Sequence, residues 1–239
     1  MTERAVVVIP TYDERENLPR IVAAVLAAEP DVHVLVVDDA SPDGTGALAD
    51  ELAKSEPRVR VMHRRGKEGL GRAYLDAFAR LLADPIGYTH VIQIDADFSH
   101  DPCSIGALRR ACREGADVAV GSRWTKGGGT QGWPRSRQWM SKGGSRYASL
   151  VLGVPVRDLT AGFKCWRREV LEALPLDRIL TAGYGFQIEM TTRAVKLGFR
   201  VVEVPITFTD RTVGTSKMSG AIFREALIGV WKLRRALAR

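Results

Sequence analysis

Short apolar runs alternate with amphipathic stretches through the first half of the chain. Residues 5–9 form an apolar run rich in valine and isoleucine, and similar runs recur at residues 32–37, 58–63, 90–94 and 117–121. Between them, apolar residues recur at helical spacing over residues 15–29, 45–55, 71–82 and 104–113. Uninterrupted apolar runs are typical of strands buried on both faces of a parallel sheet. The pattern predicts an α/β fold with a parallel, doubly wound sheet.

Ligands of such a sheet bind at the carboxyl ends of its strands, so the residues that follow each run carry the chemical information. Four clusters stand there, at residues 10–14, 38–39, 95–97 and 121–123. Two of them are acidic, and carboxylates gathered in this way are stable mainly where a cation or hydrogen-bond donors lie between them. Asp38 and Asp39 have a plainer alternative role as turn or helix-capping residues.

The Asp95-Ala96-Asp97 cluster is a candidate cation site. The chain has neither a G-x-x-x-x-G-K-[ST] loop nor a G-x-G-x-x-G motif after its first strand, which argues against a P-loop NTPase and a Rossmann dehydrogenase. Nucleotide phosphates then need another partner. One or two carboxylates together with substrate phosphates are the usual ligands of Mg²⁺ in proteins. By itself a D-x-D triplet is a weak signal, because such triplets also cap helices.

Composition narrows the class of protein. The 239 residues suit one large α/β domain or two small ones, and 45% hydrophobic with 26% charged residues is the composition of a folded globular chain. The longest charge-free stretches, such as residues 147–156, are about half the ~20 residues of a membrane-spanning helix. Three cysteines without a C-x-x-C pair, and a chain that starts directly in a strand pattern, predict reduced thiols and a cytoplasmic protein.

Charge is distributed unevenly along the chain. Residues 1–101 carry 11 Lys and Arg against 18 Asp and Glu, whereas residues 102–239 carry 24 against 10. A basic half predicts a polyanionic partner, which charge alone leaves open between nucleic acid, an acidic membrane surface and phosphorylated substrates.

Six blocks of sequence resemble one known family. They are VVIPTYDE at residues 7–14, VVDDASPDGT at 36–45, DADFSHDP at 95–102, GSR at 121–123, DLTAGF at 158–163, and VPI at 204–206 with Arg211 and GTSK at 214–217. In this order they are similar to the family 2 glycosyltransferases, and more narrowly to the dolichol-phosphate or polyprenol-phosphate mannose synthases. The resemblance implies a GT-A fold, a Rossmann-like arrangement with a mostly parallel central sheet flanked by helices. It also implies inverting transfer of mannose from GDP-mannose to a polyprenyl phosphate acceptor.

The resemblance also implies roles for single residues at the nucleotide. It places Pro10, Tyr12 and Glu14 at the nucleoside, with Val37 and Asp39 closing around the base and ribose. Tyr12 has an alternative role as an aromatic residue at the edge of the core.

The family pattern assigns the metal and diphosphate site to Asp95, Ala96 and Asp97. The expected cofactor is a divalent cation, Mg²⁺ or Mn²⁺. Ser99 departs from the pattern, because many relatives carry a glutamine there whose amide oxygen helps to bind the metal. Its hydroxyl is shorter, so a water molecule can substitute.

Cationic residues of the second half correspond to phosphate-binding positions of the family. Arg123 and Arg137 are its candidates for holding the acceptor phosphate, and guanidinium matches phosphate bidentately. Arg211 and Lys217 would reach the donor diphosphate and stabilise charge on the departing GDP. For any one of these residues the alternative is a solvated surface charge.

Gln187 and Glu189, on an expected helix, are candidates for contacting the sugar or orienting the acceptor. A solvent-facing pair on that helix is the alternative. A catalytic base is not required, because a phosphate monoester with a second pKa near ~6 is largely a dianion at neutral pH. The enzyme's task is then to position the acceptor, and His100 is expected to be structural.

The C-terminal segment combines apolar and basic residues at helical spacing. We expect residues 1–217 to form the GT-A domain and residues 218–239 an amphipathic basic helix that lies on an anionic membrane surface. The protein would then be peripheral on the cytoplasmic face of the membrane. An amphipathic helix that packs on the protein core would show nearly the same pattern.

Three other functions compete with this one. Transfer of another sugar, such as glucose from UDP-glucose, is the nearest, and a separate membrane subunit could then supply an anchor. A basic nucleic-acid-binding α/β protein is suggested by the pI of about 9.6, but the chain has no recognisable nucleic-acid-binding motif and its acidic first half would repel phosphates. A nucleotide sensor would bind without turnover.

Overall fold

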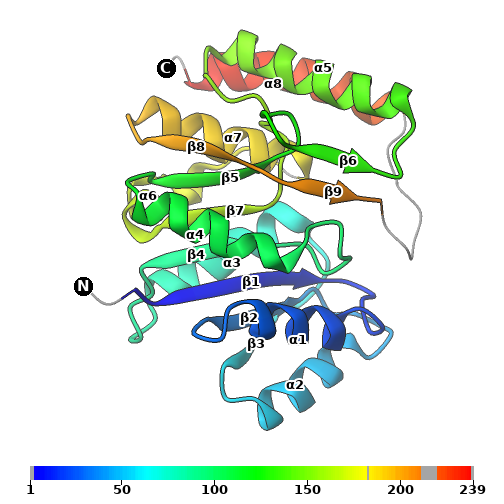
Figure 1. The fold of residues 1–239 in the computed structure, drawn as a ribbon, viewed down its shortest axis with the longest axis vertical. Helices are drawn as coiled ribbons and strands as arrows, with labels where there is room; N and C mark the ends of the chain where they lie inside the picture. Colours follow the sequence, from blue (N-terminus) through cyan, green and yellow to red (C-terminus); the bar gives the residue numbers. More distant parts are fainter. Residues whose placement is uncertain (1–2, 182, 211–219, 238–239) are drawn as a thin grey trace.

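A computed structural model describes residues 3–181, 183–210 and 220–237 of the chain (Figure 1). Its centre is a seven-stranded sheet in the order β3-β2-β1-β4-β7-β5-β8. The strands of this sheet are β1 (Ala5–Thr11), β2 (His33–Asp38), β3 (Val59–His63), β4 (His90–Gln93), β5 (Val118–Ser122), β7 (Lys164–Arg167) and β8 (Val201–Pro205). The five strand runs of the first half are thus confirmed.

The described helices cover both faces of this sheet. They are α1 (Leu18–Ala28), α2 (Thr45–Ser55), α3 (Leu70–Leu82), α4 (Ile105–Arg113), α5 (Arg135–Leu152), α6 (Arg168–Ala173), α7 (Tyr184–Lys196) and α8 (Gly220–Leu237), with 3-10 turns at Pro102–Ser104 and Leu176–Arg178. Side chains of α1, α2 and α4 join one core cluster, and side chains of α3, α6 and α7 join another. The expected layers of an α/β fold are confirmed.

Strand β1 shows why an unbroken apolar run was needed. Val7 and Ile9 pack into the cluster on one face of the sheet, and Val6 and Val8 pack into the cluster on the other. All four are at most 1% exposed. Successive side chains of a strand point to opposite faces, so a strand covered by helices on both sides must be apolar throughout.

Strand β7 interrupts the parallel order. It lies between β4 and β5 and runs antiparallel to both, whereas every other pair of neighbours in this sheet is parallel. The apolar pattern did not predict this strand, so the purely parallel sheet expected from that pattern is wrong and the mostly parallel one is right. A second, two-stranded sheet pairs β6 (Gly129–Gln131) with β9 (Thr207–Thr209).

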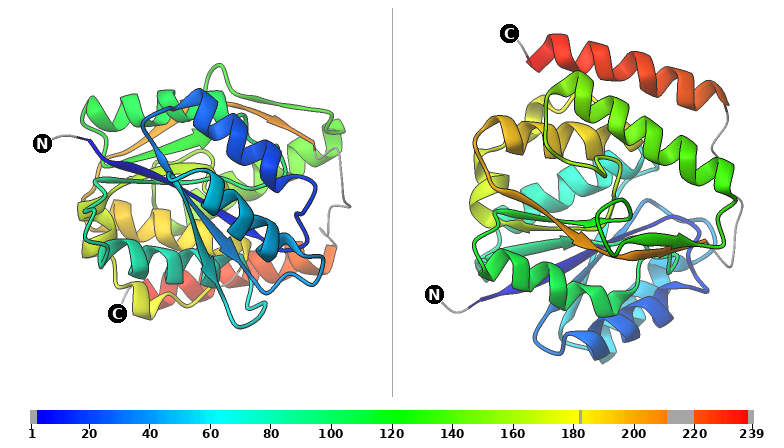
Figure 2. Two further views of the ribbon diagram at one scale, coloured as in Figure 1. Left: turned by 90° about the horizontal axis from the view of Figure 1, so that it is seen from below. Right: turned by 45° about the horizontal axis from the view of Figure 1, so that its top comes forward.

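Helices α5 and α8 lie side by side along one edge of the molecule (Figures 1 and 2). Ala148 and Leu152 of α5, Ile188 of α7, and Val230 and Leu233 of α8 form a third apolar cluster. A helix, α8, covers residues 220–237, and the division of the chain at residue 217 stays a prediction. Because Val230 and Leu233 are 5% and 3% exposed, one side of α8 is part of the folded core.

Candidate active site

The carboxyl ends of the central strands open into one cavity of about 510 Å³. Acidic residues of the first half and basic and aromatic residues of the second half line it together. Among its lining residues are Pro10, Tyr12, Glu14, Asp39, Asp95, Ala96, Asp97, Arg123, Trp133, Arg137 and Gln187. The cavity therefore brings together the clusters that the strand ends predicted, in the position expected for an open α/β sheet.

The backbone is strained at three residues that directly follow lining residues of this cavity. Asp13, Ala40 and Phe98 are the described non-glycine residues with positive φ, at 59°, 55° and 58°. Each follows the end of one of the adjacent strands β1, β2 and β4. Left-handed backbone costs free energy for residues with a Cβ and is concentrated where structure serves a site. The three turns thus mark the same edge of the sheet as the cavity does.

Asp95 and Asp97 follow β4 closely. Asp97 is 7% exposed, and its Oδ1 accepts a hydrogen bond from the backbone N–H of Ser99 at 3.0 Å. Asp95 Oδ2 lies 3.8 Å from His100 Nδ1. Below them, burial first and the negative charges of Asp95 and Asp97 second raise the pKa of Tyr74 well above its usual value. The two carboxylates therefore place negative charge at this end of the cavity.

The donor set at this position fits a hard divalent cation. Asp95 and Asp97 are carboxylates, and both line the cavity. The described residues include no cluster of three or more Asp, Glu, His or Cys placed to hold a metal ion by themselves. Mg²⁺ and ions like it characteristically bind through one or two carboxylates and complete their shell with water and substrate phosphate. The arrangement fits a cation that is bound together with a nucleotide.

Ser99 is placed differently from the expectation. It is 1% exposed and does not line the cavity, and its hydroxyl has no hydrogen-bond partner among the described residues. Its backbone carbonyl accepts from the N–H of Thr209, which ties β9 to this turn. As a metal ligand Ser99 stays a prediction, which the cavity lining does not support.

Tyr12 and Glu14 line the cavity beside Pro10 and Asp39, as expected for a nucleoside pocket. Lys67 Nζ lies 3.4 Å from the centre of the Tyr12 ring. Lys67 is not among the site residues that the sequence predicts. The available signal was a lysine inside the glycine-rich segment after the third strand, next to the carboxyl edge of the sheet.

Asp39 forms an ion pair with Arg64 across the cavity wall. Burial raises the pKa of Asp39, while the Arg64 guanidinium opposes that rise. Arg64 is held in turn by Asp76 at 2.9 Å. Asp38, in contrast, accepts hydrogen bonds from the N–H and hydroxyl of Ser41, so the turn role expected for it is the one it has.

Val37 has its side chain in the core instead of the cavity. It is 0% exposed and packs with the α3 side of the sheet. The expectation that Val37 closes on the base therefore needs correction, since only its backbone remains available. Alternation along β2 is the cause, because adjacent strand residues point to opposite faces.

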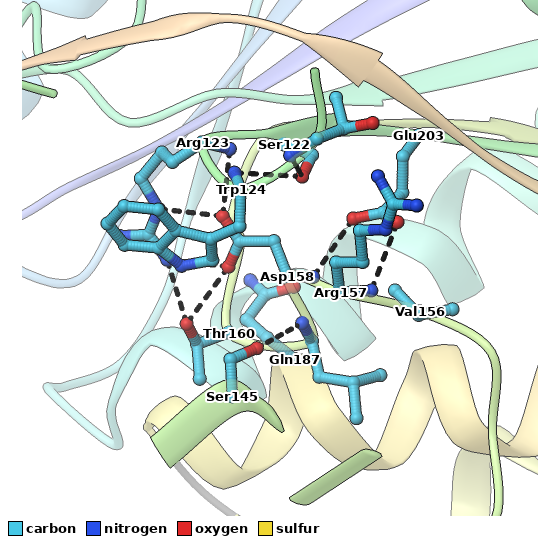
Figure 3. A network of polar contacts seen from close by, with 12 residues as sticks. Ser122, Arg123, Trp124, Ser145, Val156, Arg157, Asp158, Thr160, Gln187 and Glu203 are labelled. Carbon is cyan, nitrogen blue, oxygen red and sulfur yellow. Dashed lines mark hydrogen bonds and ion pairs between the residues drawn. The ribbon is translucent and has the colours of Figure 1, made fainter. Parts of the chain in front are cut away.

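Arg123 is buried and fixed rather than solvated. Its Nε and Nη2 donate to the two carboxylate oxygens of Asp158, each at 2.7 Å, and Nη2 also donates to Thr160 Oγ1 at 2.8 Å (Figure 3). Asp158 is 0% exposed and also accepts from the backbone N–H of Arg123. The alternative of a solvated surface charge is wrong for this residue, because its side chain is 9% exposed and paired.

Arg137, on α5, reaches the same cavity from another side. Its guanidinium carbon lies 4.0 Å from the centre of the Trp133 ring, and Nη1 is 3.0 Å from both carboxylate oxygens of Asp210. This pair is more open than that of Arg123, since the two side chains are 26% and 39% exposed. Arg123 is also within 5.5 Å of the Trp133 ring. The Trp133 ring is therefore close to both candidate phosphate-binding residues.

Gln187 and Glu189 diverge although they are two residues apart on α7. Gln187 lines the cavity, whereas Glu189 does not. Glu189 is 0% exposed and accepts from the N–H groups of Leu180 and Thr181, each at 3.0 Å, and from Arg193. The expected contact of Glu189 with the sugar needs correction: its carboxylate supports the loop before α7. Arg211 and Lys217 lie outside the described residues.

Two relatives match all or nearly all of the chain. Polyprenol monophosphomannose synthase of Mycolicibacterium smegmatis is 53% identical over 241 residues, covering 100% of this chain and 90% of the relative. Undecaprenyl-phosphate mannosyltransferase of Micrococcus luteus is 47% identical over 227 residues, covering 95% and 92%.

Solved structures share the fold at low sequence identity. Glucosyl-3-phosphoglycerate synthase of Mycobacterium tuberculosis, solved with Mn²⁺, UDP-glucose and phosphoglyceric acid, has a TM-score of 0.72 at 19% identity, covering 98% of this chain and 80% of that one. A mannosyltransferase from Pyrobaculum calidifontis, in complex with GDP-Man and Mn²⁺, has a TM-score of 0.61 at 14% identity, covering 99% and 74%. The expected GT-A fold is confirmed.

A family match agrees with these likenesses. Residues 6–174 match the family described as Glycosyl transferase family 2, a stretch that covers well over half of the chain and includes Asp95, Asp97, Arg123 and Asp158. The protein therefore belongs to glycosyltransferase family 2.

Proposed function

We propose that this protein transfers mannose from GDP-mannose to a polyprenyl phosphate, giving polyprenyl-phosphate mannose and GDP. The observation that carries the proposal is that two carboxylates, Asp95 and Asp97, line the same cavity as two arginines, Arg123 and Arg137. A nucleotide diphosphate with a cation suits the first pair, and a second phosphate suits the arginines. The names of the two relatives support mannose and a polyprenyl phosphate.

The residues act mainly by positioning. A divalent cation held by Asp95 and Asp97 would supply positive charge at the donor diphosphate. Arg123 and Arg137 hold the acceptor phosphate, and an oxygen of that dianion attacks the anomeric carbon as the bond to the diphosphate breaks. The attacking and leaving groups lie on opposite sides of this carbon, so its configuration inverts. Orientation alone can contribute ~7–11 kcal/mol to such a step.

Arg123 is well suited to this role because its direction is preset. Two of its nitrogens are engaged by Asp158, so little conformational freedom remains to be lost when a phosphate binds. Arg137 would exchange its contact with the partly exposed Asp210 for the phosphate. Apolar residues of α5, α7 and α8, namely Met140, Ala148, Ile188 and Val230, line the cavity beyond the arginines. They offer an apolar wall for the prenyl chain.

Radiolabelled sugar donors test this proposal and its main rival together. The protein is incubated with polyprenyl phosphate and Mg²⁺ or Mn²⁺, and with labelled GDP-mannose, UDP-glucose or UDP-N-acetylglucosamine in separate tubes. We expect label in the organic extract only with GDP-mannose. Label from UDP-glucose alone would contradict the proposal, and binding of GDP without any transfer would indicate a nucleotide sensor.

We further propose that the protein binds an anionic membrane surface through the edge formed by α5 and α8. Within the described part of the chain, every helix is too short or too polar to cross a bilayer. Trp139 is 77% and Leu150 73% exposed on α5, and Trp231 is 45% exposed on α8. The exposed basic residues Arg135, Lys142 and Arg146 follow the same stripe of α5. Tryptophan and basic side chains together suit the headgroup region.

Flotation with liposomes tests this attachment. We expect wild-type protein to float with vesicles that contain anionic lipid, and the Lys142→Glu/Arg146→Glu variant to stay at the bottom. The matched control is Arg15→Glu/Lys54→Glu, which changes the net charge equally at exposed positions in the first half of the chain. Equal flotation of both variants would refute the proposal that the basic residues of α5 bind the membrane. A separate membrane subunit and a cytoplasmic location stay predictions.

A further inference from the structure

Lys164 is a fully buried cation next to the active-site cavity. It is the first residue of β7, the antiparallel strand, and is 0% exposed. Its Nζ donates to the backbone carbonyl of Gln187 at 3.0 Å and to Gln187 Oε1 at 2.7 Å. Both hydrogen bonds thus end on the same residue, which itself lines the cavity.

These bonds determine which way the Gln187 amide faces. An ammonium group has three donors and no acceptor, so only the amide oxygen can meet it. The amide nitrogen Nε2 is therefore directed away from Lys164. Nε2 is buried, and the described residues provide no hydrogen-bond partner for it. A buried donor without a partner is costly, which points to a partner that arrives with a ligand.

The position of Gly162 shows where Nε2 lies. A Cβ at Gly162 would be 3.6 Å from Asp95 Oδ2 and 3.8 Å from Gln187 Nε2. The candidate metal ligand and the amide nitrogen therefore border the same small part of the cavity. Nε2 needs a hydrogen-bond acceptor in that part of the cavity. An oxygen atom of a nucleotide sugar, placed beside the cation site, satisfies Nε2.

We propose that Lys164 is a positioning residue, which fixes the Gln187 amide so that its NH₂ group donates to an oxygen of the bound nucleotide sugar. The proposal rests on the proposed function for the identity of the ligand. The oxygen belongs either to the diphosphate or to a sugar hydroxyl, and both are acceptors. Lys164 acts through Gln187 and does not touch the ligand.

The chemistry of the site explains why a lysine stands there. Burial lowers the pKa of Lys164 to about 7, so keeping a charge at this position opposes folding. The neighbouring Trp166 ring, 5.6 Å from Nζ, is apolar, and an apolar side chain of similar length would pack against it at no such cost. Asp158 acts on Lys164 only through its field, which favours the charged form. A buried lysine is therefore retained for the hydrogen bonds that its amine donates to Gln187.

Calorimetric titration with GDP and with GDP-mannose, both with Mn²⁺, tests the proposal without any need for transfer. The variants are Lys164→Met, Gln187→Leu and the double variant, with Lys196→Met as the matched control on the exposed side of α7. We expect each single variant to weaken binding about tenfold. The double variant should be no weaker than Gln187→Leu, because Lys164 acts only through Gln187. Lys196→Met should bind as wild type does.

Comparing the affinities for GDP and GDP-mannose identifies the oxygen that accepts from Gln187 Nε2. Loss of affinity for both GDP and GDP-mannose assigns it to the diphosphate, and loss for GDP-mannose alone assigns it to the sugar. Gln187→Glu tests the proposal even if Lys164→Met fails to fold. It keeps a hydrogen-bond partner for Lys164 but replaces the NH₂ donor of Gln187 with an acceptor. It should weaken binding at least as much as Gln187→Leu.

Two results would overturn the proposal. One is binding of both ligands within twofold of wild type by Lys164→Met and Gln187→Leu. The other is additive losses in the double variant, which would show that Lys164 does not act through Gln187. If wild-type protein bound UDP-glucose instead, the proposed function would fail, and the same titrations would be made with UDP and UDP-glucose. Binding of GDP-mannose without transfer would likewise leave this inference standing.

Discussion

The acidic first half and the basic second half of the chain build the same cavity in different ways. In residues 1–101 the acidic groups come from segments just after strands, and Asp95 and Asp97 are two residues apart. In residues 102–239 the cationic groups are fixed by carboxylates from remote positions, with Arg123 on Asp158 and Arg137 on Asp210. The net positive charge of residues 102–239 is therefore larger than the positive charge at the site that is not already paired with a carboxylate. What the second half provides is arginines held in a set direction.

The largest effect is expected at the acidic side. Asp97→Asn should lower the rate of transfer by about 10³-fold or more. The proposed cation would lose a carboxylate ligand, and the negative charge that develops on the departing diphosphate would be less well neutralised. The amide oxygen can still accept from the N–H of Ser99, so the turn should persist. Asp101→Asn is the matched control, since Asp101 is exposed and only caps the turn before α4. Transfer at the wild-type rate in Asp97→Asn would refute the cation assignment.

The two arginine pairs should differ strongly in their effect on stability. Asp158→Asn leaves the Arg123 guanidinium buried without a counter-charge and should lower the free energy of unfolding by about 3–5 kcal/mol. Asp210→Asn breaks a more exposed pair and should cost less than about 1 kcal/mol. Urea unfolding of both variants measures the contrast. Equal losses would contradict the distinction between a buried and an open pair.

Arg137→Ala should separate acceptor from donor binding. We expect the KM for polyprenyl phosphate to rise about 30-fold, which corresponds to the loss of a charge-assisted hydrogen bond of about 2 kcal/mol. GDP affinity should stay within twofold, because the acidic side is untouched. Arg110→Ala, an exposed arginine on α4 outside the cavity lining, is the control. A larger effect on GDP than on the acceptor would reverse the roles of the two halves.

Lys164 should give the stability of the protein a specific pH dependence. Its pKa is about 7 in the folded protein and 10.5 ordinarily, so between these values the unfolded chain holds a proton that the folded protein lacks. The free energy of unfolding then rises with pH in this window, by up to ~1.4 kcal/mol per pH unit. Lys164→Met should remove that part of the slope, and Lys196→Met should keep it. Unfolding curves between pH 7 and 10 provide the comparison, and equal slopes in wild type and Lys164→Met would contradict it.

The smallest effect is expected at Lys67, the cation of the acidic half that lies over Tyr12. Lys67→Ala should weaken GDP binding only two- to fivefold, because an exposed cation–π contact contributes about 0.5–1 kcal/mol. Arg65→Ala, exposed two residues earlier and not part of the cavity lining, should leave binding unchanged. An effect as large as that of Asp97→Asn would place Lys67 on the diphosphate itself.

Local patterns predicted the first half well and the second half poorly. The five early strands and the clusters that follow them depend on short-range rules, namely an apolar run and its end. Strand β7 has four residues with a lysine and an arginine among them, and only its pairing with β4 and β5 makes it a strand. Side-chain partners separated by 35 residues, such as Arg123 and Asp158, are likewise set by tertiary structure.

The same limit applies to single residues of the site. Lysine is rarely fully buried, so nothing in the sequence marked Lys164 as part of the interior. Gln187 and Glu189 looked alike as polar residues on one helix, yet they point to different surroundings. Their 200° separation around a helix, at 100° per residue, made a shared role unfavourable. Helical geometry was thus the signal available for separating them.

Crystals grown with GDP and Mn²⁺ would test directly, from the anomalous scattering of manganese, whether a cation binds between Asp95 and Asp97. We predict one strong peak within coordination distance of both carboxylates and of the GDP diphosphate. A peak elsewhere, or GDP bound in the cavity with no manganese between these two aspartates, would contradict the account.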